Sequence, residues 1–178
     1  ADIINNFEPE VTLFITAYNE IDFISQKIEN SLSLNYPKDK ITHIWITDGS
    51  NDGTPEKLKE YSGISVYHQD ERKGKTGAIN RGIQFVKTPI VIFSDANTIL
   101  NKDAIQEIVR LFNAPKVGCV AGEKRILPEK SDNAVNAGEG IYWKYESFIK
   151  KNESHLNSAI GAVGELFAIR TELYDQIE

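Results

Sequence analysis

The sequence of 178 residues lacks methionine, has a single cysteine and contains no long apolar run. With Cys119 alone, an internal disulfide is excluded and a reducing, cytoplasmic location is expected. Apolar runs such as Ile90–Phe93 are far shorter than the roughly 20 residues that cross a bilayer. We therefore expect membrane contact only through parts of a parent protein outside this chain. The start at Ala1 without methionine leads us to expect a fragment of a longer protein.

Basic residues are also fewer than acidic ones. The chain has 20 Lys and Arg against 26 Asp and Glu, a net charge of −6. Nucleic acid is excluded as a partner because phosphate binding needs a clustered excess of basic residues. The 3 histidines are scattered without the spacing of a zinc site. A composition of 40% hydrophobic and 26% charged residues is ordinary for a globular protein, and we expect one domain over residues 1–178.

Apolar, β-branched stretches alternate with stretches of helical periodicity along the chain. Strands are expected at Val11–Ala17, Ile41–Thr47, Ile64–Tyr67, Ile90–Phe93, Val117–Ala121 and Leu166–Ile169. This alternation favours an α/β fold with a mainly parallel central sheet. We expect Thr54 to be the N-cap of the helix after the second strand, followed by Pro55. Residues 133–149 form an aromatic-rich amphipathic stretch.

Polar side chains follow the ends of the expected strands, where open α/β sheets bind their ligands. The loops to consider are Thr16–Glu20, Asp48–Ser50, Lys73–Thr76 and Asp95–Asn97. Three of them carry a carboxylate that can hold a hard divalent cation, and one carries lysines that can contact phosphate. The combination indicates a metal–diphosphate ligand. Polar loops without any ligand are the simpler alternative.

Two common nucleotide motifs are absent. The segment Gly74–Thr76 resembles the end of a phosphate-binding loop, but the motif requires glycine where Gln69 stands. No G-x-G-x-x-G follows the first strand. The sharpest local feature is the pair Asp95 and Asn97, two oxygen-bearing side chains after a buried strand that can share one cation. Alternatively, Asp95 and Asn97 could form an Asx turn, without any ligand.

Four motifs follow one another at the strand ends: Val11-Thr12-x-x-x-Thr16-Ala17-Tyr18-Asn19-Glu20, Asp48-Gly49-Ser50-Asn51-Asp52-Gly53-Thr54, Gly74-Lys75-x-x-Ala78-x-Asn80-x-Gly82 and Asp95-x-Asn97. Together they resemble the catalytic domain of the family 2 inverting glycosyltransferases. The resemblance runs from about Glu8 to the C-terminus. It implies a three-layer α/β/α, Rossmann-like fold of the nucleotide-diphospho-sugar transferase (GT-A) type. Residues 142–146 and 161–170 further resemble the polysaccharide-synthase-like branch of the family.

The resemblance also implies roles. The residues expected to surround a nucleotide-sugar donor, a UDP-sugar, are Thr16, Ala17, Tyr18, Glu20, Asp48, Lys75 and Asp95. Asp95 and Asn97 would bind Mg²⁺ or Mn²⁺, with Asn97 supplying less charge than the aspartate usual at its position. The sugar would pass with inversion to a hydroxyl of a glycan or lipid-linked acceptor. Because the family's general base is expected beyond Glu178, we expect this chain to bind donor but to turn over poorly or not at all.

Two other functions are compatible with parts of the pattern. A noncatalytic, flavodoxin-like binding or regulatory module would use its acidic strand ends only to hold a cation, without preference for nucleoside diphosphates. Such a module is complete in about 100–150 residues, which would leave residues 133–170 as surplus. A nucleotidyltransferase on a related sheet would need a glycine-rich first loop, and Thr16–Glu20 is not one.

Overall fold

The computed structural model describes residues 7–122 and 165–175 of the chain. Its elements, in order, are β1 (Val11–Ala17), α1 (Ile21–Leu32), β2 (Ile41–Asp48), α2 (Thr54–Lys59), β3 (Ser65–Gln69), α3 (Gly74–Gly82), η1 (Ile83–Phe85), β4 (Ile90–Asp95), α4 (Ala104–Leu111), β5 (Cys119–Ala121), β6 (Leu166–Arg170) and η2 (Thr171–Leu173). The aromatic stretch at 133–149 and the glycine-rich residues 161–164 lie outside the described residues. No helix within the described ranges is long and apolar enough to cross a membrane.

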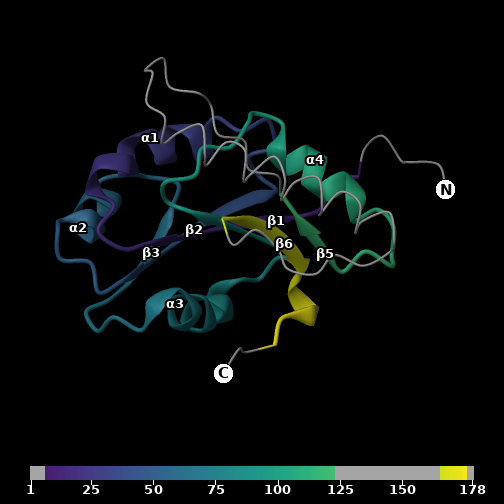
Figure 1. Cartoon of the computed structure of the whole chain (residues 1–178). Helices are drawn as coiled ribbons and strands as arrows, with labels where there is room; N and C mark the ends of the chain where they lie inside the picture. Colours follow the sequence, from purple (N-terminus) through teal and green to yellow (C-terminus); the bar gives the residue numbers. More distant parts are fainter. Residues whose placement is uncertain (1–6, 123–164, 176–178) are drawn as a thin grey trace, which may run out of the picture.

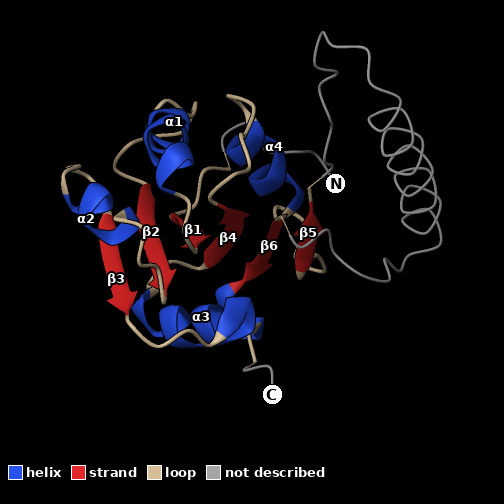
Figure 2. Cartoon of the chain, turned by 60° about the vertical axis from the view of Figure 1, so that its left-hand side comes forward, coloured by secondary structure: helices blue, strands red, loops and turns tan. Residues whose placement is uncertain are grey.

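The described strands form a six-stranded sheet of order β3-β2-β1-β4-β6-β5 (Figures 1 and 2). The pairs β1–β2, β1–β4 and β2–β3 are parallel, whereas β6 runs antiparallel to both β4 and β5. The expected mainly parallel sheet is confirmed. Chain order reverses at β1, because β2 and β3 extend to one side of it and β4 begins the other side. Such a reversal point is where open α/β sheets bind ligands.

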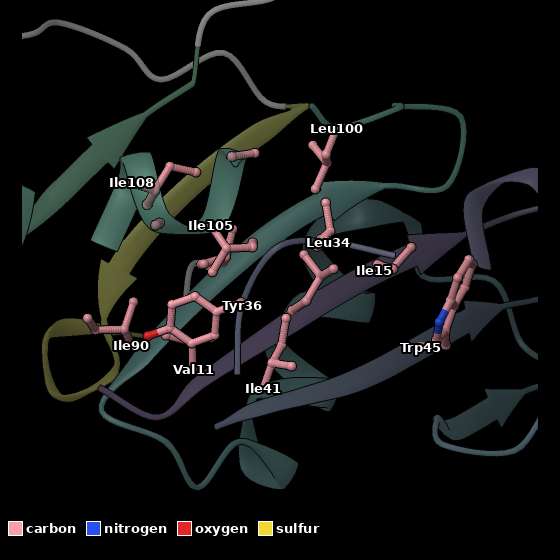
Figure 3. Packing of buried hydrophobic residues seen from close by; sticks show 14 of the residues in the cluster. Val11, Ile15, Leu34, Tyr36, Ile41, Trp45, Ile90, Leu100, Ile105 and Ile108 are labelled. Atoms are coloured by element: carbon pink, nitrogen blue, oxygen red, sulfur yellow. The ribbon is translucent and has the colours of Figure 1, made fainter. Parts of the chain in front are cut away.

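Helices cover both faces of the sheet. In both views α1 and α4 lie on one side and α3 on the other (Figures 1 and 2). Alternate residues of β1 serve the two layers: Ile15 packs in the cluster with Ile24 of α1 and Ile105 of α4, and Phe14 packs with Ile79 of α3. Figure 3 shows part of the first cluster, which also contains Trp45 and Leu34. Burying side chains of this size contributes about 1.5–3 kcal/mol each. The three-layer α/β/α prediction is confirmed.

The expected N-cap of α2 is wrong. Gly53 occupies the cap position with φ of 94°, a conformation that glycine adopts without steric cost, and Thr54 is the first helical residue. The Thr54 hydroxyl accepts a hydrogen bond from the backbone N–H of Glu20 at 3.1 Å instead of capping its own helix. A contact across 34 residues therefore overrides the local capping pattern.

Candidate functional site

A pocket opens at the carboxyl edge of the sheet, where the strand order reverses. Strand register brings its walls together, because Thr16 pairs with Asp95 across β1 and β4, and Ala17 pairs with Thr47 across β1 and β2. The lining residues are Thr16, Ala17, Tyr18, Glu20, Asp48, Arg72, Gly74, Lys75, Ala78, Asp95, Ala96 and Asn97. All the residues that the sequence predicted for donor and metal binding are thus gathered around one cavity.

The loop after β1 is held in place by the loop after β2. The backbone N–H of Glu20 donates to the Thr54 hydroxyl, and that of Ile21 donates to Oδ2 of Asp52 at 3.1 Å. Oδ1 of Asp52 accepts from the backbone N–H of Thr54 at 3.0 Å. Although burial acts in the opposite direction, hydrogen bonds from Thr54 and Ile21 lower the pKa of Asp52. Asp52 and Thr54 belong to the second motif, yet they position the first loop and do not line the pocket.

Asp48, the last residue of β2, is only 4% exposed. Its Oδ2 accepts a hydrogen bond from the backbone N–H of Lys73 at 2.9 Å. Its Oδ1 is buried and accepts no hydrogen bond from the described residues. A buried carboxylate oxygen without a partner is unfavourable, because it has left water without replacing the hydrogen bonds it made there. Asp48 therefore carries an unused acceptor atom at the wall of the pocket.

Arg72 lines the pocket but was missed by the sequence analysis, which singled out only the lysines of this loop. Its guanidinium carbon lies 3.8 Å from the centroid of the Tyr18 ring, a close cation–π stack. The available signal was the basic run, which begins at Arg72 and not at Lys73. Gly49 makes the close approach possible: its φ is +71°, and a Cβ there would lie 2.7 Å from Cβ of Arg72.

Opposite charges meet at Asp95. Lys75 Nζ lies 2.5 Å from Oδ1 of Asp95, and the Thr16 hydroxyl donates to the same oxygen at 3.4 Å. Nδ2 of Asn97 donates to Oε1 of Glu20 at 3.5 Å. Burial and the negative charges of Asp95 and Asp52 raise the pKa of Glu20. Negative charge therefore gathers beside Glu20, and Lys75 offsets the part of it that lies on Asp95.

Comparison with known proteins gives the family. The family model described as Glycosyl transferase family 2 matches residues 12–177. The chain belongs to glycosyl transferase family 2. The family predicted from the four motifs is thereby confirmed, and so is the GT-A fold.

Curated relatives of this family 2 chain include a polysaccharide synthase. The chain is 37% identical over 125 residues to poly-beta-1,6-N-acetyl-D-glucosamine synthase of Staphylococcus aureus strain MSSA476. The match covers 68% of this chain and 30% of the relative. The chain therefore spans less than a third of that enzyme's length.

Solved structures of glycosyltransferases share the fold. A mannosyltransferase from Pyrobaculum calidifontis, in complex with GDP-Man and Mn²⁺, superposes with a TM-score of 0.81 at 25% identity, covering 94% of this chain and 46% of the other. TarS of Staphylococcus aureus, in complex with UDP-GlcNAc, gives a TM-score of 0.57 at 16% identity, covering 67% of this chain and 37% of the other. The second likeness concerns the fold alone.

Proposed function

We propose that this family 2 chain binds a nucleotide-diphospho-sugar and forms the donor site of an enzyme that transfers the sugar, with inversion, to an acceptor hydroxyl in polysaccharide synthesis. The observation that carries the proposal is one pocket holding both Oδ1 of Asp48, which accepts no hydrogen bond within the described part of the chain, and the Lys75–Asp95 pair. The relative named as an N-acetylglucosamine polymer synthase supports UDP-N-acetylglucosamine as the first donor to test.

Asp48 provides the means to select the base. An ionised carboxylate only accepts hydrogen bonds. Uracil and guanine each present a ring N–H beside a carbonyl, whereas the corresponding ring nitrogen of cytosine or adenine is itself an acceptor. At that ring nitrogen Asp48 would therefore favour UDP or GDP over CDP and ADP, which can donate to it only through their exocyclic amines. The ring of Tyr18, 40% exposed at the pocket, offers a flat surface beside the base.

Asp95 and Asn97 are suited to share a divalent cation with the donor. Among the described residues, no group of three or more His, Cys, Asp or Glu side chains is placed to hold a metal by itself. Mg²⁺ is commonly held by one or two carboxylates together with substrate phosphates, so two oxygen-bearing side chains fit this use. When bound, the cation would help to neutralise the departing nucleoside diphosphate.

Lys75 would provide further positive charge during transfer. We propose that its amine, which pairs with Asp95 in the structure, contacts the diphosphate when the donor is bound. Charge on the diphosphate grows as the bond to the sugar breaks, so a cation positioned there lowers the barrier. The base that deprotonates the acceptor hydroxyl is proposed to lie beyond Glu178, as the family resemblance implies.

Calorimetric titration with UDP, GDP and CDP, with and without Mn²⁺, tests the proposal. We expect the chain to prefer UDP to CDP, and Mn²⁺ to strengthen UDP binding. Asp48→Asn should abolish the preference, because the amide presents a donor as well as an acceptor. Asp70→Asn is the matched control, since Asp70 is exposed and does not line the pocket. The proposal is wrong if the chain binds none of these nucleotides.

The flavodoxin-like alternative is less well supported. Flavodoxin-like sheets have the order 2-1-3-4-5, whereas this sheet places antiparallel β6 between β4 and β5. A module of that kind would also bind a cation equally well with or without a nucleoside diphosphate, so the same titration distinguishes the two functions.

A further inference from the structure

A buried lysine of α1 contacts the residues on either side of the Asp95–Asn97 segment. Lys27, in the second turn of α1, has an exposed fraction of 0% and is among the largest fully buried side chains. It is not one of the pocket's lining residues. Neither the motifs nor the proposed donor site accounts for it.

The side-chain amine of Lys27 contacts the residues that precede and follow the Asp95–Asn97 segment. Nζ donates to the Ser94 hydroxyl at 2.8 Å and to the backbone carbonyl of Thr98. The Ser94 hydroxyl in turn donates to the carbonyl of Asp95 at 3.3 Å. Lys27 therefore fixes the residue before Asp95 and the residue after Asn97.

The next turn of α1 continues this attachment. Nδ2 of Asn30 donates to the carbonyl of Leu100 at 2.7 Å, and the N–H of Leu100 donates to Oδ1 of Asn30 at 2.9 Å. The segment from Ser94 to Leu100 is thus bound to α1 at three successive points, of which Lys27 holds the two nearest to Asp95 and Asn97. Since α1 is itself packed in the core through Ile24 and Ile28, the attachment is rigid.

We propose that Lys27 is a positioning residue, which sets the geometry of Asp95 and Asn97 for the diphosphate end of the donor without touching the donor itself. The inference rests on the proposed function. Packing alone does not explain a lysine here, because an apolar side chain of the same length would fill the space without the cost of burying an amine. The amine keeps at least two N–H groups whether or not it is protonated, so both hydrogen bonds persist in either state.

Titration with UDP in the presence of Mn²⁺, and separately with uridine, tests Lys27→Met in the full chain. Loss of a residue that orients metal ligands typically lowers affinity about 10- to 100-fold. We expect a loss of that size for UDP and no change for uridine, since uridine lacks the diphosphate. Lys38→Met is the matched control: Nζ of Lys38 also donates to two carbonyls, those of Leu32 and Leu34, but Lys38 does not line the pocket. It should retain both affinities.

The outcomes distinguish failure of the inference from failure of the proposed function. A folded Lys27→Met protein that keeps its UDP affinity, or that loses UDP and uridine affinity in parallel, would overturn the positioning role. If Lys27→Met does not fold, Ser94→Ala removes one of the two contacts and should show the same selective loss for UDP on a smaller scale. An unchanged UDP affinity in Ser94→Ala would then count against the inference. If the unmodified chain binds neither uridine nor UDP, it is the proposed function that fails.

Discussion

Asn19 and Asn51 bind each other through both side-chain and backbone groups. Nδ2 of Asn19 donates to Oδ1 of Asn51 at 3.1 Å, and the backbone N–H of Asn51 donates to Oδ1 of Asn19 at 2.9 Å. The two residues are 32 positions apart in the sequence. Their contact joins the loops after β1 and β2, and so fixes Tyr18 and Glu20 relative to Asp48 at the pocket.

Asn19 also has a φ of 51°, which few residues other than glycine and asparagine tolerate. We expect Asn19→Gly to lose the two side-chain hydrogen bonds, lowering the free energy of unfolding by about 0.5–1.5 kcal/mol for each. Asn19→Ala should lower it by about 1 kcal/mol more, because alanine is strained at positive φ. Urea denaturation of the two variants measures the difference. Equal losses would show that the backbone conformation carries no cost here.

Gly49→Ala should disturb the pocket through Arg72. At φ of +71° an alanine is strained, and its Cβ would overlap Cβ of Arg72. We expect Arg72 to move from Tyr18 and UDP affinity to fall. Gly63→Ala is the matched control, because Gly63 has φ of +80° but nothing within 4 Å of its would-be Cβ. Both variants should lose about 1–3 kcal/mol of stability from strain, but only Gly49→Ala should weaken UDP binding in titration.

Asn97→Asp should make UDP binding depend more strongly on Mn²⁺. A carboxylate supplies more charge to a hard cation than an amide does. Without metal, the same substitution replaces an N–H donor to Glu20 by a second negative charge, so the apo protein should lose stability. Titration with and without Mn²⁺, together with thermal unfolding, measures both effects. Asn113→Asp, which adds the same charge away from the pocket, should change neither.

Lys27 should make stability depend on pH in the alkaline range. Burial lowers the pKa of Lys27 from 10.5 to about 7, and the negative charge of Asp95 opposes this only in part. Between these two pH values the unfolded chain binds more protons than the folded one, so the free energy of unfolding rises with pH. Below about pH 7 both states are protonated and the contribution is constant.

Comparison with Lys27→Met isolates this contribution, because the other titrating groups are common to both proteins. The stability of the unmodified chain relative to the variant should increase between pH 7 and 9 by at most about 1.4 kcal/mol per pH unit. Urea denaturation at each pH measures it. A difference independent of pH would mean that the Lys27 amine is charged throughout this range.

The sequence was sufficient for the fold class and for the candidate site, because both follow from local pattern. Alternation of apolar strands with helical periodicity leads to an α/β sheet, and parallel strands place their carboxyl ends at one edge. Residues immediately after those strands, such as Asp48 and Asp95, must then lie close together. Register confirms this for Thr16 and Asp95, which are directly paired.

Contacts between residues far apart in the sequence could be identified only from the tertiary structure. Arg72 stacks on Tyr18, Thr54 binds Glu20 instead of capping α2, and β6 enters the sheet antiparallel. No spacing in the sequence encodes these contacts, because each depends on how separate elements pack. Lys27 is the clearest case: its partner Ser94 lies 67 residues away, and in the sequence it is one more lysine in a helix. The sequence by itself determined which residues meet at the sheet edge, because strand direction dictates it. Only the tertiary structure decided what holds them in place, because the hydrogen bonds from α1 depend on how that helix packs on the sheet.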